Sequence, residues 1–289
     1  MKTALLFPGQ GSQKLGMGKD FAATGVFGEV DDALGFKLSD IMWGDDAAEL
    51  NKTENTQPAL LAASVAAFRA LPDRDAAFVL GHSLGEYSAL VCAESLSLRD
   101  GARLLRARGL AMKEAAGGAM MAVLGLDLAA VGEICAAIPD LYVANDNCPG
   151  QVVVSGTRTA IDAAGEKFAA KGAKRAIPLA VSVPAHCPLM RPARDKMEAL
   201  LTEIEISAPK IPFVSNRTAL VDSDPVEIKK HLAEQMVNGV RFRECVLFLA
   251  ASGVDSAFEL GSGAVLSGLV KRTADLINSV AIETKENLK

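Results

Sequence analysis

The stretch that decides the fold is Ala76-Ala77-Phe78-Val79-Leu80-Gly81-His82-Ser83-Leu84-Gly85-Glu86. Its first five residues are apolar, as in a strand buried on both faces of a parallel sheet. Gly81 and Gly85 flank Ser83, and a helix is predicted to begin near Glu86. A strand, a tight glycine-flanked turn and a helix in this order form a nucleophile elbow, which presents the serine hydroxyl. The stretch therefore predicts that Ser83 is a nucleophile, with an ordinary serine in a tight turn as the alternative.

Strand-like and helical runs alternate along the rest of the chain, as expected of an α/β protein with a parallel sheet. Further strands are predicted at residues 3–7, 211–215 and 256–260. Helices are predicted at residues 57–71 and from Asp100 to about Ala116.

Residues 118–182 have a pattern of their own. Strands are predicted at residues 119–124, 141–144, 151–155 and 174–181, helices at residues 128–137 and 159–170, and a turn at residues 145–150. This βαββαβ order is typical of a ferredoxin-like unit. We therefore predict a large subdomain of residues 1–117 and 183–289 with a small ferredoxin-like subdomain, residues 118–182, inserted into it.

Composition excludes several classes of protein. The chain has 289 residues, half of them hydrophobic, which is enough for a sizeable core. No apolar run approaches the roughly 20 residues of a membrane-spanning helix, and the short apolar start predicts a first strand, not a secretory signal. Five scattered cysteines without a C-x-x-C pair favour a reducing cytoplasm and no metal site. A net charge of −5 argues against nucleic-acid binding.

A serine nucleophile needs a general base, and the chain has three histidines. His82 adjoins Ser83, and consecutive side chains in a tight turn diverge, so His82 is a poor base. His231 lies in a charged helical stretch and is expected on a solvated face. His186 lies between two prolines, in a loop after the last strand of the small subdomain. Elimination therefore favours His186 as general base and acid, with a structural loop histidine as the alternative.

Several longer motifs occur together and in order along the chain. They are residues 7–13, 53–59, 81–87, Arg108-Gly109 with Met112, and residues 145–150, 184–190 and 259–261. Together they resemble the malonyl-CoA:acyl-carrier-protein transacylases of bacterial type II fatty-acid synthesis, from the first strand to about Arg272. This resemblance implies an α/β-hydrolase-like large subdomain with a parallel sheet and an inserted ferredoxin-like small subdomain, in agreement with the pattern above.

The resemblance also implies roles for individual residues. Ser83 is the nucleophile, His186 its partner, and the backbone amides of Gln10 and Leu84 form the oxyanion hole. A main-chain carbonyl of Gln235 orients the histidine in place of a carboxylate. This role fits a sequence in which no acidic residue stands out as a third triad member.

Four arginines, Arg99, Arg103, Arg106 and Arg108, lie on or near one predicted helix, where each is ordinarily a solvated surface residue. Arg108, followed by Gly109, aligns with the carboxylate-binding arginine of the family. A malonyl thioester carries a free carboxylate, which a planar guanidinium binds through two parallel hydrogen bonds. We therefore expect Arg108 to bind the substrate carboxylate.

The implied reaction is ping-pong transfer of malonyl from malonyl-CoA, through an ester on Ser83, to the phosphopantetheine thiol of acyl carrier protein. The pantetheine arm belongs to the substrates, so no permanently bound cofactor or metal is expected. Acyl carrier protein is acidic, as is this chain, so docking requires local basic residues, although each such residue is also an ordinary surface charge. Candidate contacts to the pocket, coenzyme A or the carrier are Asn147, Lys174, Arg175, Arg191, Lys271 and Arg272.

Three positions depart from the family pattern. Ala185 stands beside His186, where relatives often carry serine or a larger residue, and this leaves malonyl and methylmalonyl selectivity open. Gly239 and Phe242 stand where relatives commonly have proline and tryptophan, in the segment that positions Gln235.

Three alternative functions remain at this stage. A transacylase subunit of a malonate decarboxylase or a polyketide pathway shares the site and differs in its carrier. An acyl-CoA thioesterase or esterase uses the same elbow, but Arg108 argues against it. A non-catalytic acyl-CoA-binding protein does not need Ser83 and His186. We expect a monomer, by resemblance alone, and the composition predicts no membrane or nucleic-acid partner.

Overall fold

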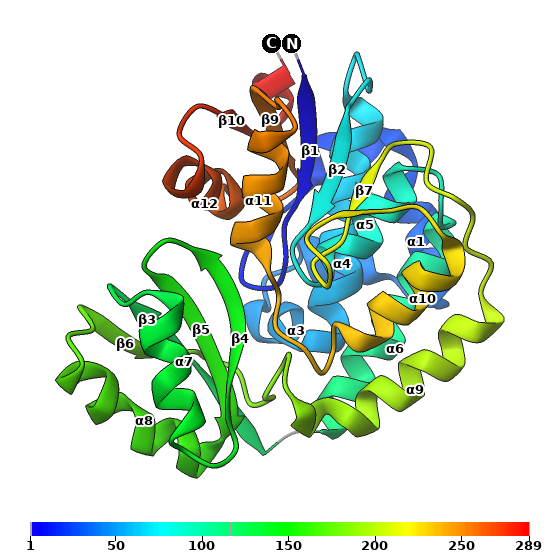
Figure 1. The fold of residues 1–289 in the computed structure, drawn as a ribbon. Helices are drawn as coiled ribbons and strands as arrows, with labels where there is room; N and C mark the ends of the chain where they lie inside the picture. The colour runs from blue at the N-terminus through cyan, green and yellow to red at the C-terminus, as the bar shows by residue number, and fades with distance from the viewer. Residues whose placement is uncertain (1, 116, 289) are drawn as a thin grey trace.

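A six-stranded sheet forms the centre of the larger of two lobes in the computed structural model, which describes residues 2–115 and 117–288 (Figure 1). All neighbouring strands pair in parallel except the last two, β7 and β8, which are antiparallel. Across the sheet the strands are β10 (Asn278–Ile282), β9 (Ser256–Leu260), β1 (Thr3–Phe7), β2 (Phe78–Gly81), β7 (Phe213–Val214) and β8 (Val221–Asp222).

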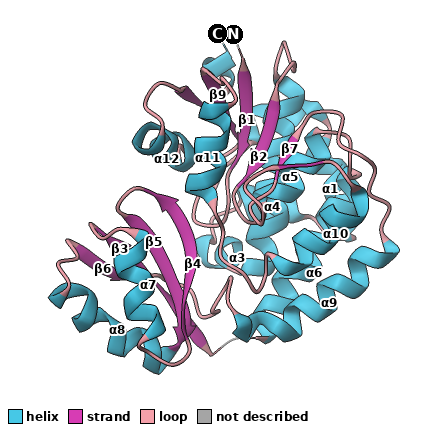
Figure 2. Ribbon diagram, in the orientation of Figure 1, coloured by secondary structure: helices cyan, strands magenta, loops and turns pink. Residues whose placement is uncertain are grey.

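Helices cover both faces of this sheet (Figure 2). Leu5 and Val79 point into a core shared with α4, α5 and α6, whereas Leu6 and Leu80 point into a core shared with α11 and α12. This alternation follows from the two-residue period of a strand. The helices of the large lobe are η1 (Lys19–Thr24), α1 (Val26–Leu34), α2 (Leu38–Trp43), α3 (Ala47–Asn51), α4 (Thr53–Ala70), α5 (Gly85–Cys92), α6 (Leu98–Glu114), η2 (Pro188–Met190), α9 (Arg191–Glu203), α10 (Pro225–Glu234), α11 (Phe242–Ala251), α12 (Val265–Thr273) and η3 (Lys285–Leu288).

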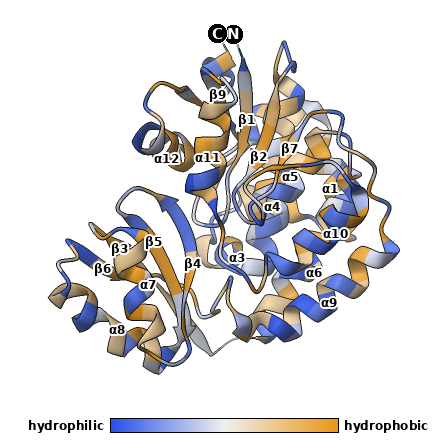
Figure 3. Cartoon of the chain, viewed as in Figure 1, coloured by the Kyte–Doolittle hydropathy of each residue, from blue (hydrophilic) through white to orange (hydrophobic). Residues whose placement is uncertain are grey.

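The smaller lobe is an antiparallel sheet with two helices on one face (Figure 1). Residues such as Val123, Val154 and Phe168 form its separate core. Figure 3 shows hydrophobic residues along β5 and mixed colours on the outer helix α8. The order β4-β5-β3-β6 confirms the predicted ferredoxin-like arrangement. Its elements are β3 (Gly118–Leu124), α7 (Leu128–Ala136), β4 (Leu141–Cys148), β5 (Gln151–Thr157), α8 (Arg158–Ala170) and β6 (Arg175–Pro178).

The predicted turn at residues 145–150 is present only at Pro149 and Gly150, because β4 continues to Cys148 and pairs there with Gln151, the first residue of β5. Asn and Asp favour turns through local hydrogen bonds. Here tertiary contacts prevail, since the Asp146 carboxylate pairs with Arg243 and the Asp146 amide donates to the carbonyl of Val240.

Smaller differences concern element ends and elements that the sequence did not indicate. Helix α4 begins four residues before the predicted start, and the last strand of the small lobe is shorter than predicted. The predicted end of α6 near Ala116 lies outside the described residues. Strands β8 and β10 were not predicted, because they are short or partly polar.

None of the helices in the described part of the chain combines the length and apolar character that crossing a bilayer requires.

Helices α4 and α6 pack closely because α6 carries Gly109 at their contact. A Cβ atom at Gly109 would lie 2.4 Å from Cα of Glu54 and 2.8 Å from the carbonyl oxygen of Thr53. Both neighbours are backbone atoms, so the helices would have to separate to admit a methyl group. This contact fixes where α6, and with it Arg108, lies against α4.

We predict that Gly109→Ala lowers the free energy of unfolding by about 1–3 kcal/mol, because overpacking outweighs the gain in helix propensity. The matched control is Gly268→Ala in α12, where no atom lies within 4 Å of the added Cβ. This control should be neutral or stabilise by up to about 1 kcal/mol. Urea unfolding of both variants measures the difference, and equal stabilities would contradict the close helix contact.

Candidate active site

Ser83 lies in a sharp turn between β2 and α5, as the elbow pattern predicts. Its φ is 54°, in the left-handed region that non-glycine residues rarely adopt. A Cβ atom at Gly81 would lie 2.0 Å from the carbonyl carbon of Gly85, and one at Gly85 would lie 2.2 Å from the carbonyl oxygen of Phe7. Both glycines are therefore required by close backbone contacts, and the turn holds Ser83 at the carboxyl edge of the parallel sheet.

The structure brings Ser83 and His186 together from segments 103 residues apart. Ser83 Oγ lies 2.9 Å from His186 Nε2, and His186 Nδ1 lies 2.8 Å from the main-chain oxygen of Gln235. A carbonyl only accepts hydrogen bonds, so Nδ1 carries the proton and Nε2 is free to accept from the serine hydroxyl. The arrangement can activate a serine nucleophile without a carboxylate.

His186 is electrostatically disposed to stay neutral. Burial is the main cause that lowers its pKa to about 3, and the positive charge of Arg108 acts in the same direction. The carbonyl of Gln235 opposes these effects by accepting from Nδ1. The imidazole therefore keeps its proton-accepting nitrogen at every ordinary pH.

Arg108 is a buried cation with neutral hydrogen-bond partners. Its side chain extends from α6 to the nucleophile, is 2% exposed, and donates from Nη2 to Ser83 Oγ at 3.2 Å. It also donates to the side-chain oxygens of Gln57 at 2.7 Å and Gln235 at 3.1 Å. Its Nε has no partner among the described residues. A buried cation is costly unless an anion pairs with it, so the site is suited to a substrate with a negative charge.

Gln10 and Leu84, the predicted oxyanion-hole residues, line the same cavity as Ser83 and His186. Leu84 directly follows the nucleophile and precedes the first turn of α5, where amides lack helical partners. Gln10 lies in the loop after β1, the neighbouring strand in the sheet. Two amides from adjacent strand ends can converge on one anionic oxygen in this position.

The cavity has a volume of about 470 Å³ and lies between the two lobes. The large lobe contributes Ser83 and Arg108, the small lobe contributes Met120 and Ala122, and His186 comes from the segment that returns from the small lobe. Ala185 also lines the cavity. A cleft of this shape admits a slender acyl-thioester arm to the nucleophile while most of its wall stays apolar.

Of the other predicted contact residues, only Asn147 lines the cavity itself. Its Oδ1 lies 2.8 Å from His82 Nε2. Arg272 is exposed and donates to the side chain of Gln151, which lines the cavity. Lys271 is its exposed neighbour on α12. Lys174, Arg175 and Arg191 do not line the cavity.

Sequence reasoning missed two buried residues behind the nucleophile, Glu86 and Asn216. Glu86 Oε1 accepts from the Asn216 amide at 2.5 Å, and Glu86 Oε2 accepts from Gln235 Nε2. Burial raises the pKa of Glu86 to about 8, although both donors and nearby Arg108 act in the opposite direction. The charged Glu86, directly after the glycine-flanked elbow, was a signal of a buried role, whereas nothing in the local sequence singles out Asn216.

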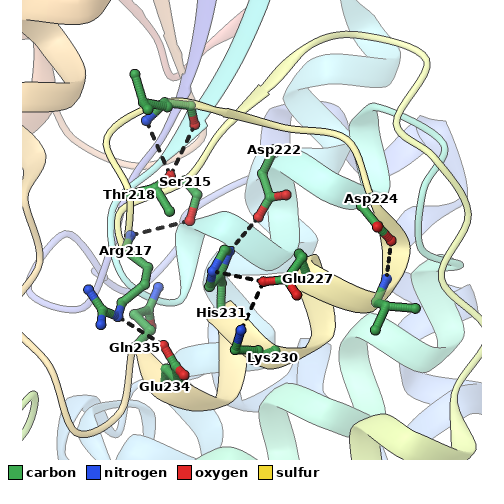
Figure 4. A network of polar contacts seen from close by, with 12 residues as sticks. Ser215, Arg217, Thr218, Asp222, Asp224, Glu227, Lys230, His231, Glu234 and Gln235 are labelled. Atoms are coloured by element: carbon green, nitrogen blue, oxygen red, sulfur yellow. Dashed lines mark hydrogen bonds and ion pairs between the residues drawn. The ribbon is translucent and has the colours of Figure 1, made fainter.

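The expected solvated face for His231 is wrong. Its Nδ1 lies 2.6 Å from Asp222 Oδ2, and its side chain is 15% exposed (Figure 4). Because β8 was not predicted, an acidic partner for His231 could not be expected from the sequence. His231 lies in a network that includes Glu227 and leads toward Gln235, and it does not contact Ser83.

Comparison with known proteins agrees with this geometry. A sequence model of the acyl transferase domain matches residues 4–285. The elbow, the histidine and this match define the chain as an acyl transferase. A malonyl CoA-acyl carrier protein transacylase of Bacillus subtilis is 43% identical over 302 aligned residues, which cover 100% of this chain and 95% of that protein. This chain belongs to the malonyl CoA-acyl carrier protein transacylase family.

Solved structures support the same assignment. The crystal structure of an acyl-carrier-protein S-malonyltransferase from Bartonella henselae has a TM-score of 0.96 and 45% identity, and covers 100% of this chain and 97% of that one. A malonyl-transacylase in complex with a type II polyketide-synthase acyl-carrier protein has a TM-score of 0.96 and 41% identity, and covers 100% of this chain and 98% of that one.

We predict that Ser83 keeps its reactivity toward a neutral serine-directed reagent, phenylmethylsulfonyl fluoride, when the pH falls from about 7 to about 5. A depressed pKa means that His186 remains neutral throughout this range, whereas a histidine with the ordinary value of 6.5 would become mostly protonated. The measurement is the rate of Ser83 modification by mass spectrometry, with Ser83→Ala as the control. A loss of reactivity centred near pH 6.5 would contradict the assignment.

Proposed function

We propose that this protein transfers the malonyl group of malonyl-CoA to the phosphopantetheine thiol of acyl carrier protein, and so supplies extender units for fatty-acid biosynthesis. The observation that carries the proposal is the buried guanidinium of Arg108, 3.2 Å from the hydroxyl of a histidine-paired serine. A malonyl group fits this combination, since its thioester carbonyl needs the serine and its free carboxylate needs a cation.

We propose a ping-pong sequence through an ester on Ser83. His186 Nε2 accepts the hydroxyl proton as Oγ attacks the thioester carbonyl, and the amides of Gln10 and Leu84 stabilise the resulting oxyanion. The tetrahedral intermediate collapses and the C–S bond breaks, with the proton of His186 passing to the coenzyme A thiolate. The carrier thiol then attacks the Ser83 ester in the same manner. Neither half-reaction calls for a group beyond the two thioester substrates.

The carrier would approach the cavity mouth near α12. Arg272 and Lys271 are exposed there, and acyl carrier protein is acidic, so these cations would attract it or the phosphate of its prosthetic group. Lys174, Arg175 and Arg191 lie away from the cavity lining, which makes them weaker candidates.

We further propose that residues 1–117 and 183–289 form the large subdomain and residues 118–182 the small one. The antiparallel sheet and its separate core within residues 118–178 support this division. A monomer working in the cytoplasm is the proposed state, and five buried cysteines with free thiols are consistent with a reducing compartment.

The main alternative is a transacylase that serves a polyketide carrier or a malonate decarboxylase. The similar enzyme solved with a type II polyketide-synthase carrier protein favours keeping the polyketide alternative. Such an enzyme would use the same Ser83, His186 and Arg108, so the choice of carrier in an assay separates the alternatives. A thioesterase would release free malonate without any carrier.

We predict a malonyl adduct on Ser83 when the protein is mixed with malonyl-CoA. Intact-protein mass spectrometry should detect the adduct, and phosphopantetheinylated acyl carrier protein should remove it. Ser83→Ala should form no adduct. Hydrolysis of the ester at the same rate with and without the carrier would instead indicate a thioesterase, and an unmodified wild-type protein would indicate a binding protein.

We predict that Arg108→Ala reduces kcat/KM for malonyl-CoA by about a hundredfold or more, because the substrate carboxylate would enter a buried site without its cation. Transfer of an uncharged acetyl group should change far less. Arg99→Ala is the matched control, since Arg99 lies on the same helix and is exposed. Equal losses for malonyl and acetyl transfer would rule out carboxylate binding by Arg108.

A further inference from the structure

The backbone of Ser83 is held on both sides by side chains that do not line the cavity. Its N–H donates to Asn216 Oδ1 at 2.8 Å, and its carbonyl oxygen accepts from Gln235 Nε2 at 3.0 Å. The amide nitrogen of Asn216 also donates to the carbonyl oxygen of Gly81 at 2.8 Å. One side-chain amide thus spans the turn from the end of β2 to the nucleophile.

Glu86 forms hydrogen bonds with both Asn216 and Gln235, the two residues that contact the backbone of Ser83. Its Oε1 accepts from the main-chain amide of Asn216, and its Oε2 accepts from Gln235 Nε2, the same nitrogen that reaches Ser83. Glu86 itself lies on the first turn of α5, three residues after Ser83, so the contacts form a closed ring around the elbow. Glu86 and Asn216 are 1% and 0% exposed, and such buried bonds do not compete with water.

Further contacts join the two segments that carry Asn216 and Gln235. Arg217, next to Asn216, pairs with Glu234, next to Gln235, at 3.0 Å (Figure 4). The amide of Gln235 donates to the carbonyl of His231, whose ring contacts Asp222. These contacts connect the loop after β7 to the end of α10. They therefore also fix the position of the Gln235 carbonyl, which accepts a hydrogen bond from His186.

A non-glycine residue at a positive φ costs of order 1–3 kcal/mol and persists only where its surroundings enforce it. Ser83 has that conformation, and the ring supplies a partner for each of its two backbone polar groups. We propose that Glu86 and Asn216 are positioning residues for acyl transfer, which act through Gln235 to hold Ser83 and His186 in register. This inference rests on the proposed function only for the choice of acyl donor.

The test is the rate of the malonylation burst in Glu86→Gln and Asn216→Asp, two isosteric changes that each put like polar groups against each other in the ring. We expect the burst to slow about 10- to 100-fold, as for a small misplacement of reacting groups, with KM for malonyl-CoA within about twofold. Asp31→Asn is the matched control, because Asp31 is another buried carboxylate with two hydrogen bonds, to Ser39, remote from the site.

Rates are expressed per folded molecule, with urea unfolding run in parallel. If both ring variants lose stability but keep burst rates within about twofold of the wild type, as Asp31→Asn should, the positioning role is overturned. If neither variant folds, amide hydrogen exchange of the wild-type protein tests the ring directly. We expect the Ser83 amide to be protected by its hydrogen bond to Asn216, and rapid exchange would contradict the proposal. Should wild-type Ser83 accept no malonyl, the proposed function fails, and modification by phenylmethylsulfonyl fluoride still compares the variants.

Discussion

Close backbone approach at the elbow is the constraint on which the site depends. Because Gly81 and Gly85 lack Cβ atoms, α5 begins almost against the ends of β1 and β2. This places Ser83 at the carboxyl edge of the sheet, beside the loop of Gln10 and in the wall of the cleft between the lobes. A single methyl group at either glycine would push the helix away and separate the nucleophile from the amides and from His186, so chemistry and backbone packing cannot be changed independently here.

The second organising feature is the buried cation Arg108, for which we propose a role in both substrate recognition and chemistry. Arg108 donates hydrogen bonds to the oxygen of Ser83 and to the side chain of Gln235. The main-chain carbonyl of Gln235 in turn accepts from His186. The charge of Arg108 also helps to keep the imidazole neutral. A substrate carboxylate that pairs with this guanidinium would therefore change the electrostatic surroundings of both reacting groups at the moment when the thioester arrives. Under the proposed function, selectivity for an acid substrate and the protonation state of His186 are therefore physically coupled.

The sequence allowed the parallel sheet, the inserted ferredoxin-like unit and the elbow to be predicted, because apolar periodicity and glycine spacing are local signals. Proximity of Ser83 and His186 followed from elimination among three histidines, and the distances agree with it. Glu86, Asn216 and the extension of β4 were missed. Their conformations depend on partners more than 90 residues away, such as Gln235 for Glu86 and Arg243 for Asp146, and no local pattern encodes such pairs.

The pairing of β1 with β9 has a consequence for how the protein is made. Residues 3–7 lie between β2 and β9, yet β9 is residues 256–260, near the other end of the chain. During synthesis the first strand therefore has one open edge until residues 256–260 have left the ribosome. Such an edge can pair with other chains. The non-local pairing of β1 with β9 slows folding and leaves the nascent chain prone to pair with other chains, whatever the stability of the finished molecule.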